Sequence, residues 1–303
     1  MKSLREQHYF LVGKHSAVKI CTWTKKSLVD EDFCYKQKFY GVQSHRCCQM
    51  TPCLYCCNRC IYCWRDTSQF LSTIPKQEDE PEFIFEKCIE GQRVLLSGFG
   101  SNPKLNWEKF REARYPKFWA ISLAGEPLLY GRLSEFLGLL KMKGHTSFLV
   151  TNGQFPERLE SLKTLPTQLY LSLDAPSKEI YKKVDRPLLK DFWERLTKTI
   201  EIFSSLRTRK VVRLTLVKDY NMHNIEGYAR LIEKANPDFI EVKAYMWVGF
   251  SRKFLKIENM PSHAEIKKFA EGIEKLTSYR YADEKENSRV VLLTKGTKNL
   301  KLD

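Results

Sequence analysis

The chain has 303 residues, with 51 Lys or Arg against 36 Asp or Glu and a formal net charge of +15 at pH 7. This length is ample for a hydrophobic core, so the fold need not rest on a disulfide framework. Residues 1–6 form no apolar signal region, and the chain has no long uncharged apolar run, so we expect no membrane segment. The positive charge favours an encounter with nucleic acid, although an ordinary basic surface has the same composition.

The basic excess is concentrated near the N-terminus, where most cysteines also lie. Residues 1–65 carry eleven Lys or Arg and four Asp or Glu, with aromatic residues between them. This mixture suits contacts to a nucleic-acid backbone and stacking on an unpaired base. Nine of the ten cysteines lie between Cys21 and Cys63. Their density predicts a thiolate-bound cofactor in this part of the chain.

Cys56, Cys60 and Cys63 have the spacing C-x3-C-x2-C. Three thiolates so spaced can bind three irons of a [4Fe–4S] cluster and leave the fourth iron without a protein ligand. An open iron can chelate a small molecule and pass it an electron, and iron–sulfur with S-adenosylmethionine is a route to radical chemistry. Structural zinc sites and ferredoxins use other spacings. We therefore predict an iron–sulfur site, with zinc or disulfides as the alternatives.

Cys21, Cys34 and Cys47 form a second set with equal separations of 13 residues. These separations are too long for one ligand loop, but three segments could converge to bind a second cluster with its own open iron. Spacing alone does not select these three, because other thiols lie nearby. The competing thiols are Cys48, Cys53 and Cys57.

Beyond the cysteine loop, an acidic connector at Gln77–Glu82 precedes a predicted helix from about Phe83 to Leu96, and helix and strand patterns then alternate. The predicted strands are Phe118–Leu123, Ser147–Thr151, Gln168–Leu173, Val211–Val217 and Asp238–Lys243. The predicted helices are Tyr130–Lys143, Pro156–Leu162, Leu189–Leu206, Asn224–Ala235 and Ser262–Leu276. This alternation predicts an α/β fold of parallel strands with crossover helices, either an open doubly wound sheet or an incomplete barrel. The Lys-rich tail, residues 295–301, is predicted to fray.

Polar residues follow the predicted strands at their carboxyl ends, where ligands gather in parallel α/β folds. Gly125 permits a close backbone approach, Glu126 offers an anion for an amino group, and Pro127 stiffens the turn. Taken alone, this triplet is also typical of an ordinary turn. The candidate cosubstrate contacts at the next two strand ends are Asn152, Ser172 and Asp174.

Eight segments together resemble a known family. The matching segments are Ala17–Cys21, Cys34–Gly41, Ser44–Cys47, Cys60–Arg65, Ile121–Pro127, Thr167–Ala175, Ile240–Met246 and Asp283–Leu293. They resemble the archaeal tRNA 4-demethylwyosine synthases, which form the tricyclic base of wybutosine biosynthesis and belong to the radical S-adenosylmethionine (radical SAM) superfamily. The resemblance covers essentially the whole chain. It implies a partial (βα)6 barrel at residues 51–303 with a cysteine-rich N-terminal extension at residues 1–50.

The resemblance also implies cofactors and their ligands. Two [4Fe–4S] clusters are expected, one on Cys56, Cys60 and Cys63 and a second on Cys21, Cys34 and Cys47. S-adenosyl-L-methionine is expected on the first cluster. The Gly125-Glu126-Pro127 triplet is similar to the superfamily motif that holds its methionine amino group.

The implied activity is that of a tRNA-modifying lyase. It condenses N1-methylguanosine next to the anticodon of tRNA-Phe with pyruvate to form 4-demethylwyosine. The resemblance assigns Lys36 to a Schiff base with pyruvate, since a lysine amine condenses with ketones once burial or nearby cations lower its pKa. The alternative role for Lys36 is a contact to a tRNA phosphate.

Further expectations concern partners and rival functions. The resemblance implies an external electron donor of the flavodoxin or ferredoxin type, and we expect a cytoplasmic monomer. Arg186-Pro187 and residues 243–252 are candidates to line a tRNA entry, or else solvated surface. Two other functions fit the residues: another radical SAM enzyme acting on RNA (a methylthiotransferase or methyltransferase), and a zinc-binding, RNA-binding protein.

Overall fold

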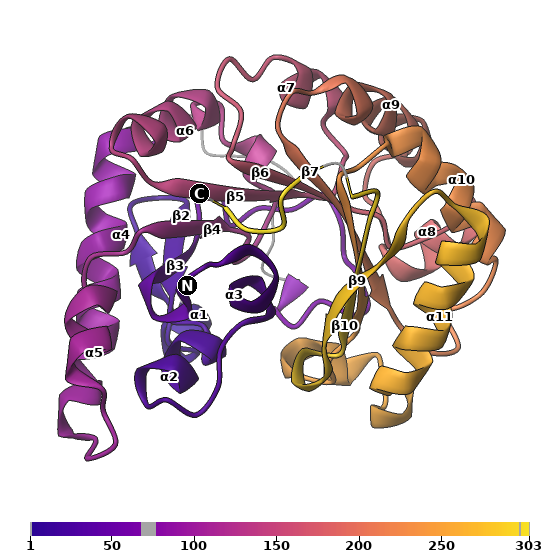
Figure 1. Cartoon of the computed structure of the whole chain (residues 1–303). Helices are drawn as coiled ribbons and strands as arrows, with labels where there is room; N and C mark the ends of the chain where they lie inside the picture. Colours follow the sequence, from indigo (N-terminus) through magenta and orange to yellow (C-terminus); the bar gives the residue numbers. More distant parts are fainter. Residues whose placement is uncertain (1, 68–76, 297, 303) are drawn as a thin grey trace.

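The computed structural model describes residues 2–67, 77–296 and 298–302, and it shows a strongly curved sheet with helices along its outer side (Figure 1). The six central strands pair in parallel in chain order. They are β3 (Cys47–Thr51), β4 (Phe118–Ile121), β5 (Thr146–Thr151), β6 (Gln168–Ser172), β7 (Arg209–Leu216) and β8 (Phe239–Ala244). The predicted partial barrel is therefore confirmed, and an open doubly wound sheet is excluded by this strand order.

Antiparallel strands extend the sheet at both edges. These strands are β1 (Phe10–Val12), β2 (Ser16–Lys19), β9 (Arg280–Lys285) and β10 (Val290–Thr294). β2 pairs with β3, and β10 pairs with β8, so the sheet continues without a break from β1 to β9. Sequence patterns did not predict them, because β1 and β2 are very short and β9 is mostly charged.

The outer layer consists of the crossover helices. They are α4 (Pro81–Leu96), α5 (Trp107–Ala113), α6 (Leu133–Met142), α7 (Pro156–Glu160), α8 (Lys178–Val184), α9 (Phe192–Ser205), α10 (Ile225–Ala235) and α11 (His263–Leu276). The predicted helices are confirmed, whereas the seven-residue helices α5 and α8 were not predicted. In the described part of the chain, no helix is both long and apolar enough to cross a membrane.

The concave side of the sheet, the lumen, is filled by the N-terminal extension. Besides α1 (Lys2–Glu6), this extension contains α2 (Thr22–Leu28) and α3 (Tyr35–Tyr40), and α3 lies on the concave side (Figure 1). Phe39 and Tyr40 of α3 are fully buried and belong to one apolar cluster with Phe148, Tyr170 and Phe239 of the strands. Since side chains alternate along a strand, these three strand residues face inward while their neighbours face the outer helices.

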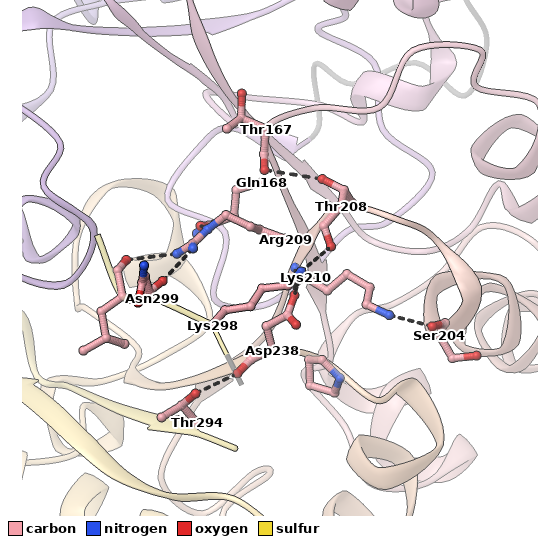
Figure 2. A network of polar contacts seen from close by, with 12 residues as sticks. Thr167, Gln168, Ser204, Thr208, Arg209, Lys210, Asp238, Thr294, Lys298 and Asn299 are labelled. Atoms are coloured by element: carbon pink, nitrogen blue, oxygen red, sulfur yellow. Dashed lines mark hydrogen bonds and ion pairs between the residues drawn. The ribbon is translucent and has the colours of Figure 1, made fainter. Parts of the chain in front are cut away.

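The C-terminal tail is attached to this same cluster, so the prediction that it frays is wrong. Arg209 donates to the main-chain oxygens of Asn299 (2.7 Å) and Leu300 (2.9 Å), next to the network in Figure 2. The main-chain nitrogen of Leu302 donates to the oxygen of Tyr40 at 3.0 Å. Leu300 and Leu302 pack against the lumen cluster. The Lys-rich composition predicted exposure to solvent, so the packing of these two leucines was not predicted.

We predict that the double substitution Leu300→Ser with Leu302→Ser lowers the free energy of unfolding by about 2 kcal/mol, because both side chains are partly buried against the lumen cluster. Denaturant unfolding followed by circular dichroism measures this. The control, Lys298→Gln with Lys301→Gln, keeps both leucines and removes the Lys298–Asp238 ion pair and the contact of Lys301 with the main-chain oxygen of Lys38. It is expected to change stability by less than about 1 kcal/mol, because these contacts lie near the surface. Equal stability of both double variants and the unaltered chain would show that the tail does not contribute.

Candidate active site

The cysteine loop follows β3 and lies at the carboxyl ends of the parallel strands. Main-chain hydrogen bonds hold it from two sides. The nitrogen of Arg59 donates to the oxygen of Asp185 at 3.0 Å, and the nitrogen of Phe250 donates to the oxygen of Trp64 at 2.9 Å. These partners come from the crossover after β6 and from the segment after β8. The loop conformation is therefore fixed by the barrel itself.

The thiols of Cys56, Cys60 and Cys63 lie close enough to interact electrostatically. The pKa of Cys60 is raised well above its ordinary value, first by burial, then by Asp185 and by the other two thiols. Three neighbouring half-buried thiols are stabilised as thiolates by nearby cations, and the irons of a cluster supply that charge. The donor set therefore fits the implied cluster.

The same thiols do not form a preformed zinc site. Within residues 2–67, 77–296 and 298–302, no three His, Cys, Asp or Glu side chains converge to hold one metal ion. A structural zinc ion needs four ligands around one centre, whereas a cubane cluster takes each thiolate on a separate iron.

The competing thiols differ from the expected ligands in pKa or in burial. Cys57 forms a hydrogen bond with Cys56 that lowers the pKa of Cys56 and raises that of Cys57, so Cys56 is the more easily ionised of the two. Cys48 and Cys53 are fully buried in the core between the sheet and the outer helices. Cys88 lies in this core too.

Cys21, Cys34 and Cys47 come together on the lumen side. Cys21 precedes α2, Cys34 precedes α3, and Cys47 begins β3. Burial, and then the charge of Cys21, raises the pKa of Cys34 to about 12. The pKa of Cys47 is also raised to about 12, first by burial, while Lys36 opposes and the other two thiols add to the shift. These mutual effects show three neighbouring thiols beside one ammonium group.

Lys36 lies inside the lumen and is only 8% exposed. Its ammonium nitrogen is 4.7 Å from the ring centroid of Phe148 and 4.8 Å from that of Tyr170. The two rings belong to neighbouring strands, and they hold the cation between their faces and the thiols. This position favours chemistry in the lumen over contact with a phosphate at the surface.

Sequence reasoning missed Glu241, a fully buried carboxylate on β8. The hydroxyl groups of Tyr35 and Tyr40 each donate to it at 2.9 Å. Both tyrosines are on α3, so Glu241 fixes both ends of the helix that carries Lys36. No local sequence pattern could have predicted these hydrogen bonds, because Tyr35 and Tyr40 are 206 and 201 residues from Glu241 in the sequence.

A second lysine, Lys243, lies near the same helix. Burial, followed by the charge of Arg213, lowers the pKa of Lys243 to about 8. Its ammonium group donates to the main-chain oxygen of Ser288 at 2.7 Å and is 5.7 Å from the ring centroid of Tyr35. Lys243 is therefore the chemical rival of Lys36 for condensation with a ketone.

The Gly125-Glu126-Pro127 turn is built against the cysteine loop. Gly125 has φ +67°, and a Cβ there would lie 2.1 Å from the main-chain oxygen of Cys53, so only glycine fits. Glu126 is 1% exposed. Its carboxylate accepts from the Thr151 hydroxyl and the Asn152 main-chain nitrogen, both at 2.8 Å. Burial raises the pKa of Glu126 to about 7.

The other predicted cosubstrate residues lie at the same strand ends. The side-chain nitrogen of Asn152 is 3.7 Å from the sulfur of Cys56. Asp174 accepts from the Tyr62 hydroxyl and the Thr215 main-chain nitrogen, both at 2.6 Å. Ser172 ends β6 and is half-buried. Pro127 begins a short 3-10 helix, Pro127–Leu129. The structure thus places all the predicted residues along one edge.

Asp185 is a second carboxylate that the sequence did not reveal. One of its oxygens accepts from the Tyr62 hydroxyl at 3.0 Å and lies 3.4 Å from the sulfur of Cys60. Its other oxygen is buried without a hydrogen-bond partner among the described residues. Burial, and then the charge of Asp174, raises the pKa of Asp185 well above its ordinary value. Its position between two helices has no sequence signature.

Comparison with known proteins defines the class first. The model for the radical SAM superfamily matches residues 50–232, which include the cysteine loop, and the model for wyosine base formation matches residues 234–295. The chain is therefore a radical SAM protein. A tRNA 4-demethylwyosine synthase of Pyrococcus abyssi is 54% identical over 295 residues, which are 95% of this chain and 86% of that protein. The Mus musculus enzyme is 42% identical over the whole chain, which spans 42% of it.

Solved structures agree with this relationship. A structure of TYW1 with a lysine-pyruvate adduct bound has a TM-score of 0.90 at 39% identity, covering 99% of this chain and 97% of that one. An archaeal TYW1 structure has a TM-score of 0.82 at 36% identity, covering 99% and 98%. The chain belongs to the family of S-adenosyl-L-methionine-dependent tRNA 4-demethylwyosine synthases.

The raised pKa of Glu126 gives a testable pH dependence. The carboxyl group holds its proton more tightly when folded than at its ordinary value of 4.5, so its contribution to stability is complete below pH 4.5 and is lost as the pH rises through about 7. We predict that Glu126→Gln removes this loss, which is about 3 kcal/mol.

The measurement is denaturant unfolding of the cofactor-free chain at pH 5 and pH 8. The control is Glu135→Gln, because Glu135 is exposed and the guanidinium of Arg132 lowers its pKa. This control should leave the Glu126-dependent loss in place. If Glu126→Gln and the unaltered chain lose equal stability between the two pH values, the buried carboxyl group is not the cause.

Proposed function

We propose that this chain condenses N1-methylguanosine, next to the anticodon of tRNA-Phe, with pyruvate to form 4-demethylwyosine. The curated relatives bear the name of this enzyme, and one solved relative holds a lysine-pyruvate adduct. The observation that carries the proposal is the position of Lys36. Its amine lies in the lumen beside three thiols and between two aromatic rings.

We further propose two [4Fe–4S] clusters. Cys56, Cys60 and Cys63 would hold the first, and Cys21, Cys34 and Cys47 would hold the second. When bound, the first cluster with S-adenosylmethionine supplies the electron and the radical for hydrogen abstraction. The second set of thiols surrounds Lys36, which supports a role in binding pyruvate.

The residues around these thiols have defined tasks in this proposal. Glu126 would bind the amino group of the cosubstrate, with Gly125 and Pro127 shaping its turn. Lys36 would condense with the pyruvate ketone and release water. Asn152, Ser172 and Asp174 complete the cosubstrate contacts. The target base, in a single-stranded loop, would be splayed into the lumen at modest unstacking cost.

The proposal extends to organisation and partners. Residues 1–50 would act as an extension carrying the second ligand set, on a catalytic domain formed by residues 51–303. The continuous sheet joins the two, because β1 and β2 precede β3 in the same sheet. An external flavodoxin or ferredoxin would supply electrons to a cytoplasmic monomer.

We predict that Lys36→Ala abolishes incorporation of labelled pyruvate carbon into tRNA, while dithionite-driven cleavage of S-adenosylmethionine continues. Borohydride should trap labelled pyruvate on Lys36 of the unaltered chain, located by peptide mass mapping. Lys243→Met, the matched control, should retain this adduct. Trapping of pyruvate on Lys243 would refute the assignment of the Schiff base to Lys36. If labelled pyruvate carbon never enters RNA, the result would favour a methylthiotransferase or methyltransferase.

We predict that the anaerobically reconstituted chain holds about eight irons. The triple variant of Cys21, Cys34 and Cys47 to Ala should hold about four irons and still cleave S-adenosylmethionine, but should not convert the base. The control Cys48→Ala should retain all of the iron, because Cys48 faces the core. A colourless, zinc-containing protein, or full base conversion by the triple variant, would contradict the two-cluster proposal.

A further inference from the structure

Aromatic rings and cationic side chains form one surface beside the cysteine loop. We call this surface the rim platform, and its residues are Arg186, Trp247, Phe250, Arg252, Lys253 and Phe254. Each ring carries one cation. The guanidinium of Arg186 is 4.8 Å from the ring centroid of Phe254, and that of Arg252 is 4.5 Å from Trp247. The ammonium of Lys253 is 4.5 Å from Phe250.

These cations lack carboxylate partners. Among the described residues, Arg186, Arg252 and Lys253 form no ion pair, and all three are exposed. The sequence from Tyr245 to Ile257 contains no Asp or Glu. By contrast, Lys178 and many other surface cations are paired with carboxylates. A cluster of unpaired cations on apolar rings is complementary to an anionic, flat partner.

The rim platform is joined directly to the cysteine loop. Gly249 has φ +61°, and a Cβ there would lie 2.2 Å from the main-chain oxygen of Trp64, so the two segments are in close contact. Phe250 donates its main-chain nitrogen to that same oxygen at 2.9 Å. On the other side, Pro187 forms a β-bridge with Asn58 of the loop. The rim platform therefore borders the opening of the site.

The rim platform is also preformed. The indole nitrogen of Trp247 donates to the main-chain oxygen of Leu255 at 2.9 Å. The hydroxyl groups of Tyr245 and Ser251 are hydrogen-bonded at 2.7 Å. Phe254 nevertheless remains 39% exposed. A rigid surface with an exposed ring and stacked guanidinium planes matches the way proteins bind unpaired RNA bases, on rings and on Arg planes.

We propose that the rim platform binds the unpaired nucleotides flanking the target base, with phosphates on Arg252 and Lys253 and a base stacked on Phe254 or Arg186. This inference rests on the proposed function. Holding the flanking nucleotides keeps the target nucleotide at the opening of the lumen while its base leaves the stack. An acidic electron-donor protein is the competing partner. It would bind the cations of the rim platform but would not need the guanidinium groups stacked on aromatic rings.

The test uses the full chain with both clusters reconstituted and a fluorescent anticodon stem-loop of tRNA-Phe containing N1-methylguanosine. Anisotropy gives the Kd as a function of salt. Arg252→Gln with Lys253→Gln should weaken binding and reduce the salt slope by about 1–2. Phe254→Ala should weaken binding by about fivefold or more with an unchanged slope. Cleavage of S-adenosylmethionine by dithionite without RNA should be unchanged in both.

The matched control is Lys163→Gln with Arg207→Gln. These two cations are exposed at the opposite, amino edge of the strands, before β6 and β7. The control removes the same charge and should change Kd by less than about twofold. Equal weakening by both double variants would indicate diffuse attraction and overturn the proposal.

Three further outcomes separate the hypotheses. The platform variants could bind RNA normally and turn over more slowly only when flavodoxin is the reductant. This result would assign the rim platform to a protein partner and overturn the inference. If the unaltered chain binds the stem-loop through the rim platform but never converts the base, the proposed function fails and the binding surface stands. If conversion proceeds and no platform variant weakens binding, the binding surface alone fails.

Discussion

A buried carboxylate governs the geometry of the lumen. Glu241 is withdrawn from water on β8, and a carboxylate there would be costly without hydrogen bonds and a compensating charge. Tyr35 and Tyr40 supply the hydrogen bonds from α3. Burial lowers the pKa of the Arg213 guanidinium, but Tyr35 and then Glu241 outweigh this and raise it, so Arg213 lies near Glu241. Satisfying this one group requires α3 to lie inside the barrel. Lys36, on the same helix, is thereby carried to the centre of the lumen.

The fold was predictable because its signals are local. Alternating apolar strands and amphipathic helices over residues 118–276 predict five parallel strands with crossovers, and all five are present. The sixth parallel strand, β3, was not predicted. The lumen was not predictable in the same way. Glu241 appears in the sequence as one polar residue in an apolar strand, and its partners on α3 are about two hundred residues away. The prediction for the C-terminal tail was wrong for a related reason. The Lys-rich composition predicted exposure to solvent, but Leu300 and Leu302 pack against a distant apolar cluster.

The cysteines show a choice between candidate ligands that sequence spacing alone cannot make. Cys47 and Cys48 are adjacent, and spacing alone does not select one of them as a ligand. Side chains alternate across a strand, so the two sulfurs must face opposite sides of β3. Cys48 faces the core beside Cys88, and Cys47 faces the thiols of Cys21 and Cys34. In the proposed second cluster, the choice of Cys47 over Cys48 follows from which side of the sheet the extension covers. No sequence pattern indicates that side.

The charge distribution divides the molecule into two regions. The surface is positive, and the sequence carries +15 at pH 7. Beside the cysteine loop, however, Glu126, Asp174 and Asp185 are buried carboxyl groups, and burial raises the pKa of each. Burial disfavours the ionised form of a carboxyl group, and a neighbouring cation favours it. A sulfonium or amino group entering this pocket would therefore be matched by newly formed negative charge, while the polyanionic RNA remains attracted to the outer surface. In the proposed function, these opposite signs would place the two substrates on separate binding surfaces of one site.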